Sequence, residues 1–259
     1  MTGERVRVEA AEGTARVELA RPEARNAVDL PMCLQLRAAF EELDADDSVR
    51  VVLLAAQGPV FCAGADLKER TGKDAAWVRR RRMASFAAYA AIEACRRPVV
   101  ALLQGAVVGS GGEITLAADF ALAADDVTFR FPEPHWGTVG ATQRLQRAIG
   151  KRRAKELLFT NRPLGAREAH ELGIVSRLVP AAELAAAGHE TAARIAGAPP
   201  SAIALTKRAV DLGAETDLDR GIRIEMAAIE QNLADGGWRD GVERFRDRAR
   251  TAPTTEEDA

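Results

Sequence analysis

Two glutamates are the residues of this sequence that could exchange protons with a substrate. Glu113 lies in the first turn of a predicted helix, among small and apolar residues where a solvated charge is out of place. Glu133 follows an alternating, strand-like segment on a turn flanked by proline residues. Two carboxylates beside an oxyanion hole can share a water molecule and exchange a proton with it. We therefore interpret Glu113 and Glu133 as a general acid/base pair.

Two loops of small residues could supply the oxyanion hole itself. The segment Phe61–Leu67 follows one predicted buried strand, and Gly105–Gly112 follows the next. Small side chains let backbone N–H groups approach a ligand closely, and a loop that opens a helix adds the positive end of the helix dipole. Each loop could therefore give one N–H donor to a single developing oxyanion. The alternative is that both loops are simply tight turns.

The sequence lacks the motifs typical of several other kinds of chemistry. The run Gly109–Gly112 is no dinucleotide fingerprint, because position 114 is not glycine, and no GxxxxGK[ST] motif occurs. The hydrolase motif GxSxG fails around Ser110, where position 108 is valine. The three cysteines, Cys33, Cys62 and Cys95, are widely spaced and match neither a disulfide framework nor a zinc site. We expect no metal and no separate cofactor.

The composition indicates a folded protein with a large core. Of the 259 residues, 47% are hydrophobic and 29% are charged, and 36 Lys+Arg against 38 Asp+Glu leave a net charge of −2. These values argue against a disordered chain and against a protein that coats nucleic acid. The longest uncharged apolar stretch, Pro98–Gly112, is shorter than the roughly 18 residues of a membrane span. We therefore expect a cytoplasmic chain that binds neither nucleic acid nor membrane.

Alternating strands and helices must position the candidate residues. Two amphipathic runs around Glu12 and Gly13 predict a hairpin, and Asp29 is the predicted N-cap of the following helix. Continuous apolar runs predict buried strands over 49–56, 99–103 and 120–124. This order predicts an α/β core over 1–195, with ligand sites in loops at the carboxyl ends of the strands. Residues 196–259 are predicted to be helical and to end in a disordered tail.

Five stretches of the sequence together resemble the crotonase, or enoyl-CoA hydratase/isomerase, superfamily. The most specific is Phe61–Arg70, with the sequence FCAGADLKER. The others are Arg21–Ala27, Gly105–Glu113 with Asp119 after it, Pro132–Glu133 and Thr142–Leu145. The resemblance covers about Arg21 to Pro180. It implies an α/β, ClpP/crotonase-like spiral of ββα units followed by a C-terminal helical trimerisation region.

The resemblance also implies roles for particular residues. The backbone N–H groups of Ala65 and Ser110 correspond to the family's oxyanion hole, and Glu113 and Glu133 correspond to its pair of catalytic glutamates. The substrate's coenzyme A is expected along a further set of residues, with Lys68 near its phosphates. This set comprises Ala24, Arg25, Ala27, Ala63, Gly64, Asp66, Leu67, Lys68 and Gly109.

An intact pair of glutamates favours an enoyl-CoA hydratase, which adds water to a 2-trans-enoyl-CoA through an enolate stabilised in the oxyanion hole. One alternative is another acyl-CoA reaction of the same family, carried out by an isomerase, decarboxylase or hydrolase. A second alternative is a non-catalytic relative that binds CoA thioesters or RNA, which the intact pair disfavours. The resemblance also predicts a homotrimer or homohexamer.

The sequence departs from the family pattern at two places. Ser110 stands where the family usually has glycine, and residues 134–141 are about three residues shorter than usual, which could reposition Glu133. Within this segment, His135 and Trp136 are interpreted either as residues of the acyl pocket or as packing residues of a short turn. The run Arg79–Arg82 is interpreted as a solvated or inter-subunit helix face rather than as a site for CoA phosphates or another polyanion. Asp66 is interpreted as a helix cap rather than as a catalytic residue.

Overall fold

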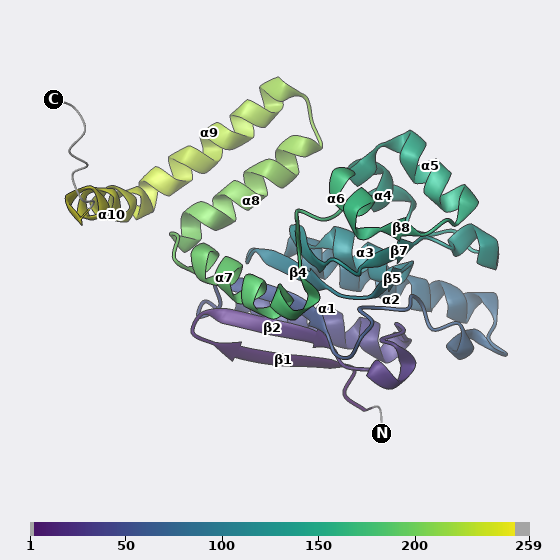
Figure 1. Ribbon diagram of the computed structural model, residues 1–259. Helices are drawn as coiled ribbons and strands as arrows, with labels where there is room; N and C mark the ends of the chain where they lie inside the picture. The colour runs from purple at the N-terminus through teal and green to yellow at the C-terminus, as the bar shows by residue number, and fades with distance from the viewer. Residues whose placement is uncertain (1–2, 252–259) are drawn as a thin grey trace. The chain divides into compact units, whose positions relative to one another are not determined.

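A six-stranded sheet forms the centre of the computed structural model, which describes residues 3–251 (Figure 1). The chain divides into two compact units, Met1–Ile195 and Ala196–Ala259. The predicted disordered tail lies, from residue 252 onward, outside the described residues. Both sheets belong to the first unit, and the second unit is helical.

The larger sheet has the strand order β1-β2-β3-β4-β6-β9. Strands β1 (Val6–Ala11) and β2 (Thr14–Leu19) form the predicted antiparallel hairpin. The other neighbours pair in parallel; they are β3 (Val51–Ala56), β4 (Val99–Leu103), β6 (Phe120–Ala124) and β9 (Arg177–Val179). Every residue of β3 and β4 is buried, as their continuous apolar sequences predict.

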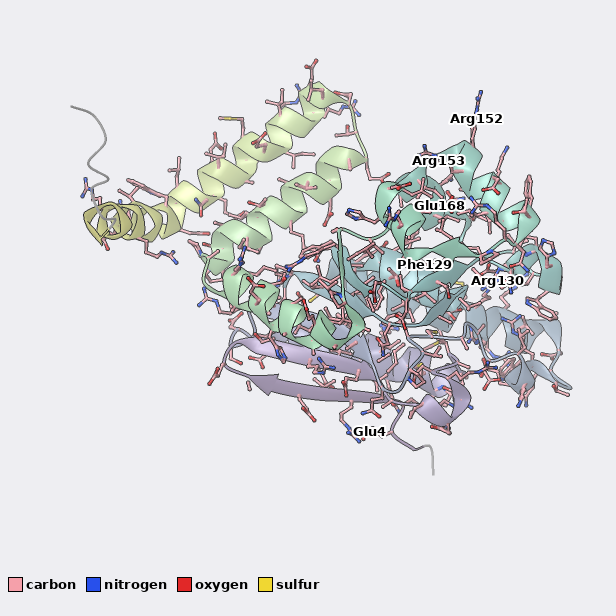
Figure 2. All side chains as sticks on the ribbon, in the orientation of Figure 1. Glu4, Phe129, Arg130, Arg152, Arg153 and Glu168 are labelled. Carbon is pink, nitrogen blue, oxygen red and sulfur yellow. The ribbon has the colours of Figure 1, made fainter. Side chains whose placement is uncertain are left out.

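A smaller sheet contains β5 (Ala106–Val108), β7 (Thr128–Arg130) and β8 (Leu164–Gly165). Strand β7 pairs in parallel with β5 and antiparallel with β8. The side chains of β7 alternate between the interior and solvent, so that Phe129 is fully buried while Arg130 is exposed (Figure 2).

The chain follows the same path three times, passing from the larger sheet to the smaller one and then into a helix. One turn runs from β4 through β5 to α3 (Ser110–Ala117). The next runs from β6 through β7 to the short helix η3 (Glu133–Trp136) and α4 (Thr142–Ile149). An earlier turn runs from β3 through Cys62, which forms a parallel bridge to Val107 of β5, to α2 (Ala75–Ala94). This spiral of ββα units confirms the predicted fold class.

Helices cover the sheets of the first unit. Helix α1 (Leu30–Ala45) begins at the predicted cap, where Asp29 Oδ1 accepts the N–H of Met32 at 2.9 Å. It packs against α2, and both helices bury apolar side chains in the core. The remaining helical segments are η1 (Pro22–Ala24), η2 (Lys68–Arg70), α5 (Lys151–Thr160), α6 (Ala166–Glu171), η4 (Ala181–Glu183) and α7 (Leu184–Ala196).

The second unit consists of α8 (Pro200–Ala214), α9 (Leu218–Ala234) and α10 (Gly237–Thr251). Helices α8 and α9 lie side by side and line a largely apolar cavity of about 480 Å³ (Figure 1). Several of their large apolar side chains are exposed, among them Val210, Leu218 and Ile222. None of the helices in the described part of the chain combines the length and apolar character needed to cross a membrane.

Candidate active site

Three successive turns of the spiral deliver Ala65, Ser110 and Glu133 to one place. Each residue follows closely on the second strand of its turn: Ala65 after the Cys62 bridge, Ser110 after β5 and Glu133 after β7. These second strands run parallel as neighbours, so their carboxyl ends meet at one edge. All three residues line a single cavity of about 80 Å³. The fold thus brings together both predicted oxyanion-hole residues and one of the two glutamates.

The Ala65 N–H is presented by a parallel bridge between Val28 and Ala65. On either side of Ala65, the Val28 N–H donates to the Gly64 carbonyl and the Asp66 N–H donates to the Val28 carbonyl, both at 2.8 Å. Successive peptide groups of an extended segment point to opposite sides. The Ala65 N–H is therefore directed away from Val28 and takes no part in this bridge.

The Ser110 N–H is at the start of α3, where the first N–H groups of a helix have no acceptor within the helix. The preceding residue, Gly109, has φ of 47° and ψ of −103°. A Cβ atom there would lie 2.7 Å from Glu133 Oε1, so glycine is required both by the backbone and by the carboxylate. The Ser110 side chain is buried beside the hydroxyl of Tyr89, where the packing accommodates it.

Glu133 is buried, with 8% of its surface exposed. Its Oε2 atom is buried and has no hydrogen-bond partner among the described residues. Burial raises the pKa of Glu133 above its usual value, and the negative charge of nearby Glu113 raises it further, against the opposing effect of Arg82.

Glu113, on the first turn of α3, is in a different electrostatic environment. Its Oε2 atom accepts a hydrogen bond from Arg144 Nη1 at 2.9 Å. Arg144 also donates to both carboxylate oxygens of Glu93, from Nε at 2.7 Å and from Nη2 at 2.6 Å. Glu113 is buried and is not among the residues that line the cavity. Arg144 thus forms a hydrogen-bonded ion pair with Glu113, whereas Glu133 has Arg82 nearby but no hydrogen bond to its buried Oε2 among the described residues.

The residues predicted to bind coenzyme A occupy two paired segments. Ala24, Arg25 and Ala27 belong to the first segment, which pairs with 63–66 through the Ala63 N–H and the Arg25 carbonyl at 2.9 Å. Ala63, Gly64 and Leu67 of the second segment line the cavity, as does Gly109. Four of the nine predicted residues thus line the cavity, and Ala24, Arg25 and Ala27 lie on the segment paired with 63–66; that the set binds coenzyme A stays a prediction.

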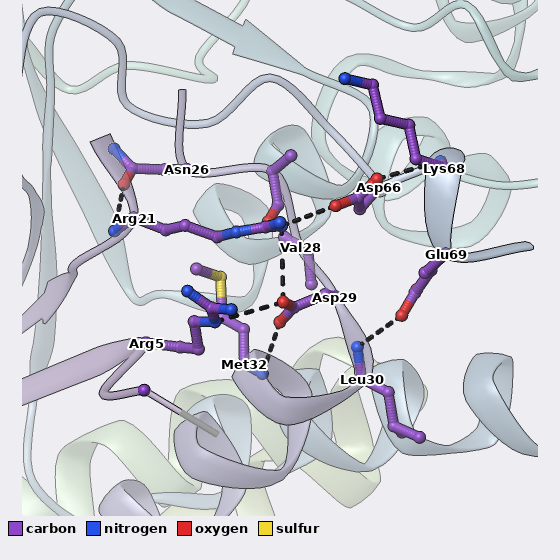
Figure 3. A network of polar contacts seen from close by, with 12 residues as sticks. Arg5, Arg21, Asn26, Val28, Asp29, Leu30, Met32, Asp66, Lys68 and Glu69 are labelled. Carbon is purple, nitrogen blue, oxygen red and sulfur yellow. Dashed lines mark hydrogen bonds and ion pairs between the residues drawn. The ribbon is translucent and has the colours of Figure 1, made fainter. Parts of the chain in front are cut away.

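Asp66 and Lys68 differ in their surroundings (Figure 3). Asp66 Oδ2 accepts from Arg21 Nη1 at 2.7 Å, and its Oδ1 accepts the N–H of Lys68 at 3.0 Å. Burial alone would raise the pKa of Asp66, but these bonds lower it below its usual value. Asp66 therefore braces the loop, but the N-cap of η2 is Leu67 and not Asp66 as predicted. The Lys68 side chain is exposed and extends away from the network.

Of His135 and Trp136, only Trp136 borders the cavity. Its side chain is 68% exposed. His135 is not among the lining residues, and its Nε2 lies 2.8 Å from the carbonyl oxygen of Phe159 at the end of α5. The structure thus separates the two interpretations, with Trp136 at the pocket and His135 packed against α5.

The interpretation of Arg79–Arg82 as a solvated or inter-subunit face is wrong for Arg81 and Arg82. Arg81 is fully buried and bonds to Glu69 Oε1 and to the carbonyl of Val28. Arg82 lines the cavity, together with Arg70. The helical spacing of the sequence could have shown this for Arg81. Arg81 lies on the same face of α2 as the buried residues Ser85, Ala88 and Ile92. Arg144, which holds Glu113, was also missed.

The described side chains include no group of three or more His, Cys, Asp or Glu residues that could hold a metal ion. The polar groups gathered here are instead carboxylates, guanidinium groups and backbone N–H donors. Such a set can stabilise an oxyanion and move protons at an adjacent carbon.

Comparison with known proteins agrees with the fold. A family model described as enoyl-CoA hydratase/isomerase matches residues 9–253. YngF of Bacillus subtilis is 35% identical over 243 residues, which cover 92% of this chain and 94% of that protein. The enoyl-CoA isomerase/hydratase fer4 of Mycosarcoma maydis is 35% identical over 246 residues, which cover 90% of each chain.

Solved structures show the same likeness. The crystal structure of enoyl-CoA hydratase from Bacillus anthracis superposes with a TM-score of 0.91 at 32% identity, covering 95% of this chain and 97% of that one. The chain therefore belongs to the enoyl-CoA hydratase/isomerase family and has the crotonase fold.

Proposed function

We propose that this protein is an enoyl-CoA hydratase, which adds water across the double bond of a 2-trans-enoyl-CoA. The observation that carries the proposal is the pair of buried glutamates beside two backbone donors. Glu133 has an unpartnered buried oxygen, while Glu113 is paired with Arg144. Two carboxylates in such different environments suit the opposite roles of acid and base.

The reaction begins with the thioester oxygen bound by the N–H groups of Ala65 and Ser110. Glu113 accepts a proton from a water molecule as the water oxygen bonds to C3. The electron pair of the double bond moves toward the thioester, and the negative charge of the resulting enolate rests on the thioester oxygen. Each preorganised donor to such an oxyanion contributes about 3–4 kcal/mol.

The enolate then collapses by taking a proton at C2. Glu133 donates this proton, so that the product gains a hydroxyl group at C3 and a hydrogen at C2. Glu113 ends with the proton taken from water, and Glu133 ends ionised. Transfer of one proton from Glu113 to Glu133, directly or through solvent, restores the starting state.

The proposed reaction uses only groups of the chain and the substrate. The Ala65 and Ser110 donors polarise the carbonyl, and the two carboxylates move the protons, so we propose that no metal or separate cofactor takes part. Coenzyme A enters as part of the substrate, along the paired segments 24–27 and 63–68. Activity that survives dialysis against a chelator supports this proposal, and activity restored only by an added metal ion contradicts it.

The proposal is tested with crotonyl-CoA, whose conjugated thioester loses its ultraviolet absorbance on hydration. We expect the wild type to hydrate it, and E113Q and E133Q each to lose about 10² to 10⁴ in rate through loss of acid/base catalysis. The matched control is E171Q, at an exposed glutamate of α6. A wild type that binds the thioester but shifts its double bond instead of hydrating it is an isomerase.

We also propose that the protein is a cytoplasmic homotrimer or homohexamer. The exposed apolar residues of α8 and α9, such as Val210 and Ile222, support association, because a large apolar surface is seldom left in contact with water. Light scattering on the purified full chain tests the assembly, and a monomer contradicts it. Recovery of the native protein in a membrane fraction contradicts the cytoplasmic location.

A further inference from the structure

Two arginines border the cavity that contains the oxyanion-hole donors. Arg70 ends the short helix η2, and Arg82 lies on the first half of α2. Both line the same cavity as Ala65, Ser110 and Glu133. A group bound to the two backbone donors would therefore have two guanidinium groups beside it.

Arg82 is held toward the cavity by neutral acceptors. Its Nη2 atom donates to the carbonyl of Val139 and to Thr138 Oγ1, which belong to the shortened segment 134–141. A Cβ atom at Gly140 would lie 3.1 Å from Arg82 Nη2 and 3.0 Å from Glu133 Cγ. The cation is thus fixed next to the glutamate, and the segment that departs from the family pattern is what fixes it.

Arg70 is the less satisfied of the two arginines. Its Nε atom is buried and has no hydrogen-bond partner among the described residues. Burial and the positive charges of Arg81 and Arg82 lower the pKa of Arg70. The neighbouring carboxylate of Glu69 is already bound by Arg81 and by the N–H of Leu30. Arg70 therefore lacks an anion of its own.

Three other buried or half-buried arginines of this chain each contact a carboxylate. Arg21 contacts Asp66, Arg81 contacts Glu69, and Arg144 contacts Glu93 and Glu113. In the described part of the chain, neither Arg70 nor Arg82 forms an ion pair with a carboxylate. The two guanidinium groups repel each other, and the carboxylate of Glu133, which lies beside Arg82, forms no ion pair with it in the described part of the chain. A bound anion would relieve this repulsion.

We propose that Arg70 and Arg82 bind a carboxylate on the acyl group, so that the substrates of this protein are 2-enoyl-CoA thioesters with an acidic acyl chain. This inference rests on the proposed function, since it assumes that the thioester oxygen occupies the Ala65 and Ser110 donors. Guanidinium groups bind carboxylates through short, charge-assisted hydrogen bonds. A neutral acyl chain would leave both half-buried cations without an ion-pair partner, and such a site discriminates against it.

The test compares two substrates of equal chain length, 4-carboxybut-2-enoyl-CoA and pent-2-enoyl-CoA. They differ in whether the acyl chain ends in a carboxylate or a methyl group. We expect the wild type to have a kcat/KM about 10²-fold higher for the acidic thioester, and R70Q and R82Q each to reduce this ratio about 10-fold or more. R82K, which keeps the charge, should retain part of the preference. R80Q, at an exposed position of α2, should keep the full ratio.

Equal kcat/KM values for the two thioesters in the wild type would overturn the proposal. So would R70Q and R82Q variants that weaken both thioesters equally, since the arginines would then serve the CoA phosphates or the fold. If neither thioester is hydrated, binding is measured by calorimetry. Tighter binding of the acidic thioester that R70Q and R82Q abolish would keep this inference while the hydratase proposal fails, and equal binding would reject it.

Discussion

Arg144 Nη1 donates to Glu113 Oε2 across 2.9 Å and thereby ties α4 to the first turn of α3. The same guanidinium group binds both oxygens of Glu93 on α2 and lies 5.5 Å from the centre of the Tyr89 ring. Three helices therefore fix the direction of one carboxylate. Glu133, by contrast, is placed by the tight turn after β7 and by the absence of a side chain at Gly109.

R144Q should lower kcat for enoyl-CoA hydration about 10-fold or more, with a smaller change in KM, because it removes the group that orients Glu113 and leaves the backbone donors in place. R144K keeps the charge and should recover part of kcat. Steady-state kinetics on crotonyl-CoA measures both constants. The control is R152Q, at an exposed position on α5 that Figure 2 shows projecting outward. An unchanged kcat in R144Q would remove Arg144 from the site.

E133Q should change stability in a way that depends on pH. Because the pKa of Glu133 is raised in the folded protein, its protonated form stabilises the fold below the ordinary value of 4.5. That contribution is lost as pH rises through the raised pKa. The glutamine side chain is neutral at every pH. The melting temperatures of E133Q and wild type should therefore agree near about pH 4, and E133Q should melt at the higher temperature near about pH 8.

Thermal unfolding followed by circular dichroism checks this prediction. E171Q serves as the control, since Glu171 is an exposed glutamate of α6. A difference in melting temperature that shrinks as the pH rises would show that the charge on Glu133 does not destabilise the fold. If E133Q is more stable than the wild type and also loses the ability to hydrate enoyl-CoA, then the buried glutamate serves catalysis at a cost to stability.

G109A should damage both the fold and the site. Alanine is strained at φ of 47°, and its Cβ would lie 2.7 Å from Glu133 Oε1. We expect a loss of about 1–3 kcal/mol in the free energy of unfolding and a fall in kcat/KM. Urea unfolding and the hydration assay measure the two effects. G165A is the control, because no atom lies within 4 Å of a Cβ added at Gly165. It should change neither the free energy of unfolding nor kcat/KM strongly.

R81M should be the most destabilising of these substitutions. It leaves the Glu69 carboxylate without the cation that it contacts in the interior, and breaking such a pair costs about 3–5 kcal/mol. The double variant R81M/E69Q removes both charges and should recover part of that loss. Urea denaturation of the two variants measures the difference. The exposed R80M is the control, and similar values for R81M and R80M would contradict a structural role for Arg81.

Much of this arrangement could be predicted from the sequence because its signals are local. The buried strands β3 and β4 are continuous apolar runs, and the loops that follow them are rich in small residues. Glu113 could be recognised because a charged side chain is seldom placed among apolar residues unless it has a partner or a function. Glu133 could be recognised because it follows an alternating segment, which proved to be β7.

The parts that could not be predicted depend on packing between distant segments. Four consecutive arginines on α2 look alike in the sequence, and only the packing of that helix decides that Arg81 is buried and that Arg82 reaches the cavity. The pairing of Arg144 with Glu113 joins residues that lie on different helices. Strands β8 and β9, of two and three residues, are too short to show a period.

The bridge between Val28 and Ala65 implies an unusual pattern of tolerance to mutation. The proposed donor at Ala65 belongs to the peptide backbone, so the pairing register, rather than any side chain, decides which N–H is presented. Substitutions at position 65 should therefore be tolerated better than insertions or deletions in the segment that leads to it. A single insertion between β3 and Ala65 would slide the register by one residue and turn the presented N–H to the opposite side, although every other group of the site would be retained.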